Sequence, residues 1–234
     1  MSPEDGLTPR RPRAIYFELL VSVGIFVIPA AIGSLHAFLR PQAWPAGDVP
    51  IRMLAMAIEE LLAVLLVVHL LKLHGEGMST ISVPVVKNDA WRALALVFAS
   101  AVAGIVIVLV LYAGAPRLFQ GQEETAPSLK FLEVPITIPY VLFVLINPVA
   151  EEVLVRGFLQ TRLSQAGWRP AVIVVFSAAV QAFYHLYQGV PAMVMHFGEF
   201  LVFAGYYQKT RRLGAVVGAH AMLNICAMLA MSMR

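Results

Sequence analysis

Seven long stretches of apolar residues follow one another along the chain and are separated by short polar connections. They cover approximately residues 15–39, 51–73, 92–115, 134–163, 170–188, 191–208 and 213–233. Each is close to the ~20 apolar residues that a helix needs to cross a lipid bilayer. Segments of alternating polarity, which are typical of a membrane β-barrel, do not occur. The pattern therefore predicts an all-α polytopic membrane bundle of about seven transmembrane helices, with six or eight also compatible.

The composition is too apolar for a soluble domain. Hydrophobic residues make up 59% of the chain and charged residues only 13%, with a mean hydropathy of +0.78. The net charge of +3 comes mostly from the polar connections. We therefore expect membrane lipid, and not nucleic acid, as a partner of these basic segments. The single cysteine, Cys226, excludes a disulfide within the chain.

Lysine and arginine are unevenly distributed between alternate connections. Eleven lie on the side that includes the N-terminus and five on the other side. The first apolar run, of roughly 25 residues, is too long for the core of a signal peptide. The positive-inside rule therefore predicts a multi-pass integral protein of a plasma or cytoplasmic membrane, with a cytoplasmic N-terminus and an external C-terminus.

Ionisable residues within apolar runs are concentrated in the second half of the chain. We expect a single membrane domain over residues 1–234, in which residues 1–133 supply shielding helices and residues 134–234 form the catalytic core. An ionisable side chain at membrane depth costs about 2.5–3.5 kcal/mol on insertion scales. Each such residue is therefore a candidate functional residue.

Two adjacent carboxylates and an arginine stand in the fourth apolar run, in the segment AEEVLVRG. On a helix, Glu152 and Arg156 share one face, whereas Glu151 is rotated by ~100° from its neighbour. Arg156 is therefore expected to neutralise Glu152 and to leave Glu151 free to face a cavity. A purely structural ion pair that joins two helices is the alternative.

Two histidines and an asparagine follow on later helices. His185 lies near the end of the fifth apolar run, and His220 and Asn224 share one face of the seventh. With a carboxylate they could activate water and stabilise an oxyanion, although a single intramembrane histidine is more often a hydrogen-bonded core residue. Residue counting from the cytoplasmic helix ends gives depths from ~10 Å for His220 to ~22 Å for His185. Tilt or a kink near Pro148 would remove this mismatch.

Other acidic residues in the apolar runs favour structural roles. Glu59 and Glu60 have no arginine four residues later, so we expect them to act in helix packing or at the membrane interface. His196 and Glu199 are three residues apart, a spacing that permits metal binding, but no HExxH motif or third ligand accompanies them. We therefore expect a structural pair there and no metal site.

Two short motifs carry a family resemblance. EEVLVR, which begins at Glu151, matches EExxxR, and HAMLN, which ends at Asn224, matches HxxxN. In the order and spacing of these motifs the chain resembles the CPBP family, which contains the type II CAAX prenyl endopeptidases and bacteriocin-processing or immunity proteins. The similarity begins at about Pro148. One position departs from the family's FxxxH motif, because Gln181 stands four residues before His185 and could hydrogen-bond the imidazole or form a different pocket wall.

The resemblance implies an intramembrane endopeptidase that depends on a glutamate and requires neither a metal nor another cofactor. By position, Glu151 would be the general base on water, and His185 would help to hold that water. His220 and Asn224 would stabilise the oxyanion of the tetrahedral intermediate. The implied substrate is a membrane-associated or prenylated peptide or protein.

The pair of Glu152 and Arg156 would hold the other site residues in place. A non-catalytic relative would also keep this polar cluster. Such a relative, an immunity or scaffold protein that binds a peptide or protein partner, is the second hypothesis. A proton-coupled transporter is the third, since it also requires buried glutamate and histidine. No internal inverted repeat or pair of broken helices supports the transporter.

Overall fold

The computed structural model describes residues 12–40, 45, 47–120 and 136–232, so the first arginines of the chain lie outside it. All regular elements among the described residues are helices. The α-helices are α1 (Pro12–Leu19), α2 (Ile25–Leu39), α3 (Val49–Leu73), α4 (Asp89–Gly114), α5 (Ile138–Glu151), α6 (Thr161–Gln165), α7 (Pro170–Phe183), α8 (Val190–Thr210) and α9 (Leu213–Ser232). Two π-helical segments are η1 (Leu20–Gly24) and η5 (Glu152–Gln160), and short 3-10 turns are η2 (Met78–Thr80), η3 (Pro116–Phe119) and η6 (Leu186–Gln188).

Each predicted apolar stretch forms a helix or a continuous run of helices. The first is α1–η1–α2 and the fourth is α5–η5–α6, so the all-α bundle of about seven helices is confirmed. Among the described residues, five helical segments are long and apolar enough to cross a membrane. The two others are α7, which has only 14 residues, and α8, which carries His196 and Glu199.

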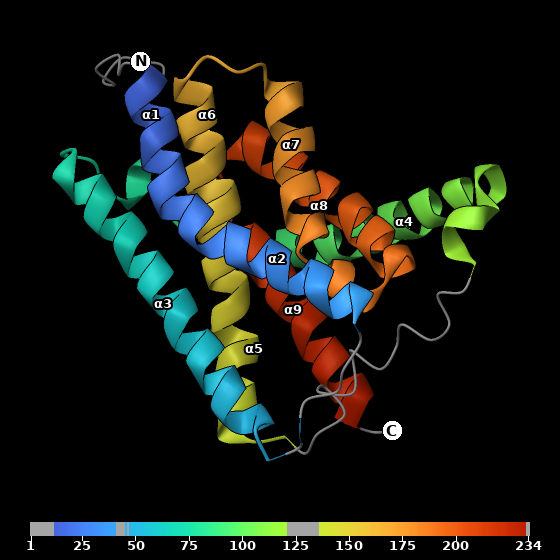
Figure 1. Cartoon of the computed structure of the whole chain (residues 1–234). Helices are drawn as coiled ribbons and strands as arrows, with labels where there is room; N and C mark the ends of the chain where they lie inside the picture. The colour runs from blue at the N-terminus through green and yellow to red at the C-terminus, as the bar shows by residue number, and fades with distance from the viewer. Residues whose placement is uncertain (1–11, 41–44, 46, 121–135, 233–234) are drawn as a thin grey trace.

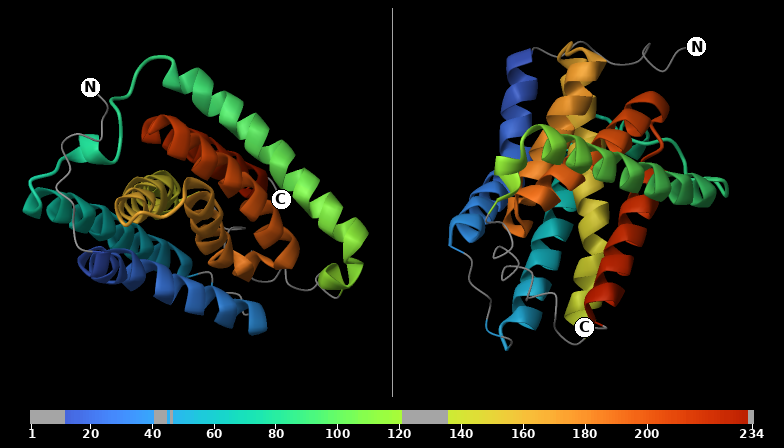
Figure 2. Two further views of the ribbon diagram at one scale, coloured as in Figure 1. Left: turned by 90° about the horizontal axis from the view of Figure 1, so that it is seen from above. Right: turned by 90° about the vertical axis from the view of Figure 1, so that its right-hand side faces the viewer.

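The α5–η5–α6 rod lies at the centre of the bundle. Seen from above in Figure 2, it is nearly end-on, with α1, α2 and α3 on one side and α7, α8 and α9 on the other. α4 is outermost and packs on α8 and α9. In Figures 1 and 2, α4 and α8 cross the direction shared by α3, α5 and α9. α1 begins at one end of the bundle and α9 ends at the other (Figure 1).

The central rod changes its winding where the acidic motif begins. Pro148 stands inside α5, and the nine residues of η5 that follow Glu151 are π-helical and all buried. A regular α-helix was expected there. Proline removes one backbone hydrogen bond from a helix, and π-helical turns are frequent at functional sites. Because every residue of η5 is buried, its polar residues Glu152, Arg156 and Gln160 must find partners on neighbouring helices.

A buried arginine ties the end of this rod to the N-terminal helices. The Arg162 side chain has no exposed surface and pairs with Glu18 of α1 at 3.0 Å and with Glu76 at 2.8 Å. Its guanidinium also lies over the ring of Phe158, 4.7 Å from the centroid. These contacts fix α1 and the turn after α3 against α6.

α4 and α8 cross at two glycines. A Cβ atom added at Gly198 would lie 2.8 Å from the Cα of Gly104, and one added at Gly104 would lie 2.8 Å from the Met195 carbonyl oxygen. Both distances are shorter than real Cβ contacts, and the obstructing atoms are backbone atoms that cannot turn away. Small residues allow this close approach of helix backbones, as they do in many membrane helix pairs.

We predict that Gly198→Ala separates α4 from α8 and destabilises the protein by about 1–3 kcal/mol, as overpacking does. The thermal midpoint of the detergent-purified protein would fall by roughly 3–10 °C. Gly205→Ala, on the same helix, is the matched control, because a Cβ there meets nothing within 4 Å. Equal midpoints for the two variants would contradict the close crossing.

Candidate active site

The Glu152 carboxylate of the candidate site is fully buried, with 0% exposed surface. Its Oε2 lies 3.4 Å from Nε of Arg156, one helical turn further along the rod. Its Oε1 lies 2.9 Å from Nδ1 of His220 on α9 and accepts a 3.2 Å hydrogen bond from Nε2 of Gln181 on α7. The expected ion pair is therefore present, and two further helices contribute to it.

Arg156 extends from Glu152 towards α8. Its Nη2 donates to the Phe200 carbonyl oxygen at 3.4 Å, and its guanidinium lies 5.2 Å from the centroid of the Phe200 ring. The next polar residue of the rod, Gln160, donates to the Ser177 hydroxyl at 2.8 Å. Ser177 and Gln181 therefore form a polar stripe on α7. This stripe faces the polar residues Glu152 and Gln160 of the rod.

The Glu151 carboxylate has a different environment from that of its neighbour. Glu151 is only half-buried, whereas Glu152 is fully buried. Oε1 of Glu151 accepts from Nδ2 of Asn147 at 2.9 Å, and Oε2 accepts from Nε2 of Gln181 at 2.7 Å. No arginine or lysine among the described residues forms a salt bridge with it. The hydrogen bonds of Glu151 thus come from neutral donors.

Gln181 joins the two carboxylates. Its side-chain amide donates to both Glu151 and Glu152, so it does not hydrogen-bond the imidazole of His185. The contact between the two residues is made instead by the main chain, because Nδ1 of His185 lies 2.9 Å from the carbonyl oxygen of Gln181. The position at which the sequence departs from FxxxH therefore belongs to the carboxylate cluster itself.

His185 lies in the turn that follows α7. Its ring packs against Tyr184 and against Phe200 on α8, with centroid distances of 4.9 and 5.4 Å. Both His185 and Tyr184 interact electrostatically with Glu151. The turn is covered by α2, where the Ser34 hydroxyl accepts from the amide of Tyr187 at 2.7 Å. The structure therefore brings His185 to the half-buried carboxylate.

α9 supplies His220 and Asn224. The His220 ring packs against Phe200 and Phe203, 5.8 and 6.2 Å away, while its Nδ1 faces Glu152. Nδ2 of Asn224 donates to Oδ1 of Asn147 at 3.0 Å. The depth mismatch from residue counting is thus absent, since the helices start at unequal heights and cross at different angles (Figure 1).

Three contributors to the cluster were missed in the sequence. Asn147 lies four residues before Glu151 on the same helix, a spacing that could have identified it. Glu60, on a helix expected only to shield the site, accepts from Nδ2 of Asn147 at 2.7 Å. Nothing in the sequence near Glu60 indicates this contact. Tyr184, at the end of α7, interacts with Glu151, and no motif in the sequence marks it.

His196 and Glu199 form the expected local pair. Nδ1 of His196 lies 2.7 Å from the Glu199 carboxylate, and Nε2 lies 3.0 Å from Oε1 of Gln188. The His196 ring is also 4.8 Å from that of His185. Within the described ranges, no three His, Cys, Asp or Glu residues gather as a group that could hold a metal ion.

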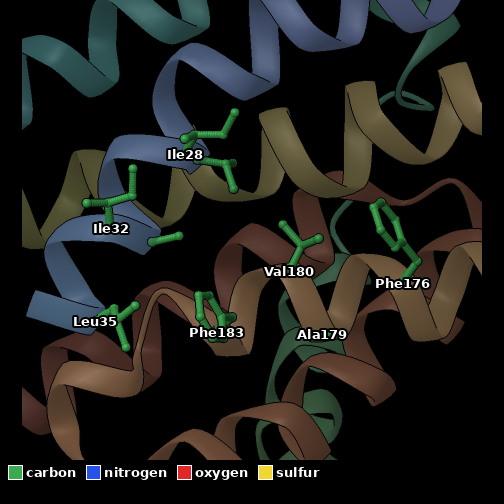
Figure 3. Close-up of a pocket in the computed structure, with 9 residues that line it drawn as sticks. Ile28, Ile32, Leu35, Phe176, Ala179, Val180 and Phe183 are labelled. Carbon is green, nitrogen blue, oxygen red and sulfur yellow. The ribbon is translucent and has the colours of Figure 1, made fainter. Parts of the chain in front are cut away.

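An apolar pocket of about 470 Å³ lies between α2 and α7 (Figure 3). Every residue that lines it is apolar, including Ile28 and Ile32 of α2 and Val180 and Phe183 of α7. None of the candidate catalytic residues lines this pocket. The pocket suits a hydrocarbon chain and contains no group that could act on a peptide bond.

Comparison with known proteins agrees with the motifs. A family model described as "Type II CAAX prenyl endopeptidase Rce1-like" matches residues 133–226, somewhat less than half of the chain. The range includes every residue from Glu151 to Asn224 that carried the resemblance, so the similarity to this protease family is confirmed. No curated protein and no solved structure matches the chain. With the five apolar helices, the match indicates a multi-pass integral membrane protein.

We predict that Arg156→Ala destabilises the protein by about 3–5 kcal/mol, because it leaves the Glu152 carboxylate buried without its cation. The thermal midpoint of the purified protein is the measurement, and Arg169→Ala is the control at an exposed arginine. Replacing both partners, in Glu152→Gln with Arg156→Met, should restore part of the loss, since no unpaired charge remains. An Arg156→Ala midpoint equal to the wild-type value would refute a structural requirement for the pair.

Proposed function

We propose that this chain, which matches the Rce1-like family over residues 133–226, is an intramembrane endopeptidase that hydrolyses a membrane-associated peptide or protein. The reaction requires a general base, a bound water and donors for an oxyanion. The cluster offers a carboxylate for the base on α5, a histidine to hold the water in the turn after α7, and donors for the oxyanion on α9. A prenylated substrate is the finer expectation from the resemblance.

The observation that carries the proposal is the unequal burial of two adjacent carboxylates. Glu152 is enclosed and paired with Arg156, whereas Glu151 is half-buried and held by the neutral donors Asn147, Gln181 and Tyr184. A structural ion pair alone would not require a second carboxylate beside it at membrane depth. Glu151 therefore suits the role of the base.

In the first step, Glu151 accepts a proton from a water molecule that His185 helps to hold. The oxygen of that water forms a bond to the carbonyl carbon of the scissile peptide, and the carbonyl oxygen becomes an oxyanion. His185 suits the holding role because its ring packs against Tyr184 and Phe200 and its Nδ1 is occupied by the main chain. Its Nε2 is the nitrogen left to contact the water.

The oxyanion would be stabilised by His220 and Asn224. Nδ1 of His220 faces Glu152, so Nε2 donates to an oxyanion when both ring nitrogens carry hydrogen, a cation that the Glu152 carboxylate favours. Asn224 has two amide hydrogens, and one of them is used by Asn147. The second is available to the oxyanion.

In the second step, the protonated Glu151 gives its proton to the nitrogen of the leaving peptide. The bond between carbonyl carbon and nitrogen breaks, which yields one product with a carboxyl group and one with an amine. Glu151 is thereby returned to its carboxylate form. These residues complete the reaction without a covalent intermediate.

We predict that Glu151→Gln lowers peptide cleavage by about 10²–10⁴-fold, because the amide cannot accept the proton of water. The measurement is a comparison of membrane-peptide termini from host cells that carry the wild type, a deletion or Glu151→Gln at matched expression. A terminus found only with the wild type would also identify the substrate. Glu59→Gln is the control at an exposed acidic residue.

Identical termini in all three strains, with the protein abundant and a phenotype present, would exclude hydrolysis by Glu151. A non-catalytic immunity or scaffold function would then explain the cluster better. Thermal midpoints of the purified variants show whether Glu151→Gln remains folded.

A further inference from the structure

We propose that Asn147 and Glu60 are positioning residues that set the orientation of the two proposed catalytic groups Glu151 and Asn224. This inference rests on the proposed peptidase function. It starts from the fact that Asn147, in the middle of the central rod, contacts side chains from three helices. Glu60 comes from α3, Glu151 from α5 and Asn224 from α9.

The hydrogen bonds of Asn147 use both of its donor hydrogens. Nδ2 donates to Oε1 of Glu60 at 2.7 Å and to Oε1 of Glu151 at 2.9 Å, while Oδ1 accepts from Asn224 at 3.0 Å. A primary amide has two N–H donors, so no further donor remains. Each of these distances lies in the range of a well-formed hydrogen bond.

The two carboxylates determine which way the Asn147 amide points. Oε1 of Glu60 and Oε1 of Glu151 both accept from Asn147, so both face the NH₂ end of its amide. The carbonyl oxygen must then face α9. Asn224 in turn must present its own NH₂ group to that oxygen, which directs its remaining amide hydrogen towards the site.

Glu60 holds Asn147 from α3, a helix that carries none of the proposed catalytic residues. With an apolar residue at position 60, one Asn147 hydrogen would lose its acceptor, and the amide could turn away from Asn224. Glu59, the preceding residue, is exposed and has no hydrogen bond to the cluster among the described contacts. It therefore provides a matched control on the same helix.

The orientation of the amides can be measured without relying on activity. The chain contains only three asparagines, Asn88, Asn147 and Asn224, so selective ¹⁵N-asparagine labelling gives three pairs of side-chain amide signals. Asn88 is exposed and distant in sequence from the cluster, and it serves as an internal reference. Asn147→Ala assigns the signals, because it removes one pair.

We expect Glu60→Leu to shift the side-chain signals of both Asn147 and Asn224 and to leave those of Asn88 unchanged. We expect Glu60→Gln to shift them much less, since its amide oxygen can still accept from Asn147. Glu59→Leu should shift none of them. Unmoved Asn147 and Asn224 signals in folded Glu60→Leu would overturn the inference, whether or not the protein is a peptidase.

Kinetics then test the positioning role. Glu60→Leu and Asn147→Ala should lower kcat by about 10²-fold with KM nearly unchanged, because a misplaced base and oxyanion donor slow the reaction without removing substrate contacts. Glu60→Gln should retain most of the wild-type kcat. Shifted amide signals combined with wild-type kcat would overturn the positioning role, whereas absence of cleavage by the wild type would count against the peptidase alone.

Discussion

The burial of the Glu152 charge is the constraint on which the rest of the structure depends. An ionised carboxylate without solvent is tolerated only when opposite charge and hydrogen-bond donors surround it. Here these partners come from three segments: Arg156 from the rod, Gln181 from α7 and His220 from α9. Each of them must reach the same point, so the charge fixes the relative heights of the helices. The relative positions of Glu151, His185, His220 and Asn224 therefore depend on the contacts of Glu152.

The buried η5 segment of the rod contacts α7 partly through polar residues. Glu152, Arg156 and Gln160 recur at every fourth position and are all fully buried. On the facing helix α7, Ser177 and Gln181 have the same spacing. Ser177 contacts Gln160, and Gln181 contacts Glu152. In lipid, apolar burial gives little driving force for helix association, so matched polar contacts of this kind add specificity to the packing. The glycine crossing of α4 and α8 supplies close packing elsewhere.

The sequence was sufficient for features that depend on one helix at a time. The number and length of the apolar stretches predicted the number of helices, and the spacing of Glu152 and Arg156 predicted their pairing. The depths of His185 and His220 could not be predicted, because tilt and helix height arise from packing between helices. The contact of Glu60 is of the same kind, since its partner is 87 residues away. The division into shielding and catalytic parts and the cytoplasmic N-terminus remain predictions.

The shortness of α7 affects the surrounding bilayer. Fourteen residues span about 21 Å, whereas the hydrocarbon core is about 30 Å thick. If the polar start of α7 at Arg169 lies at the membrane surface, its other end stops ~9 Å before the opposite surface. Where α2 does not cover this turn, lipid beside that end must thin or bend inward. The water that the proposed function places at His185 would then cross a thinner layer on this side of the membrane than on the other.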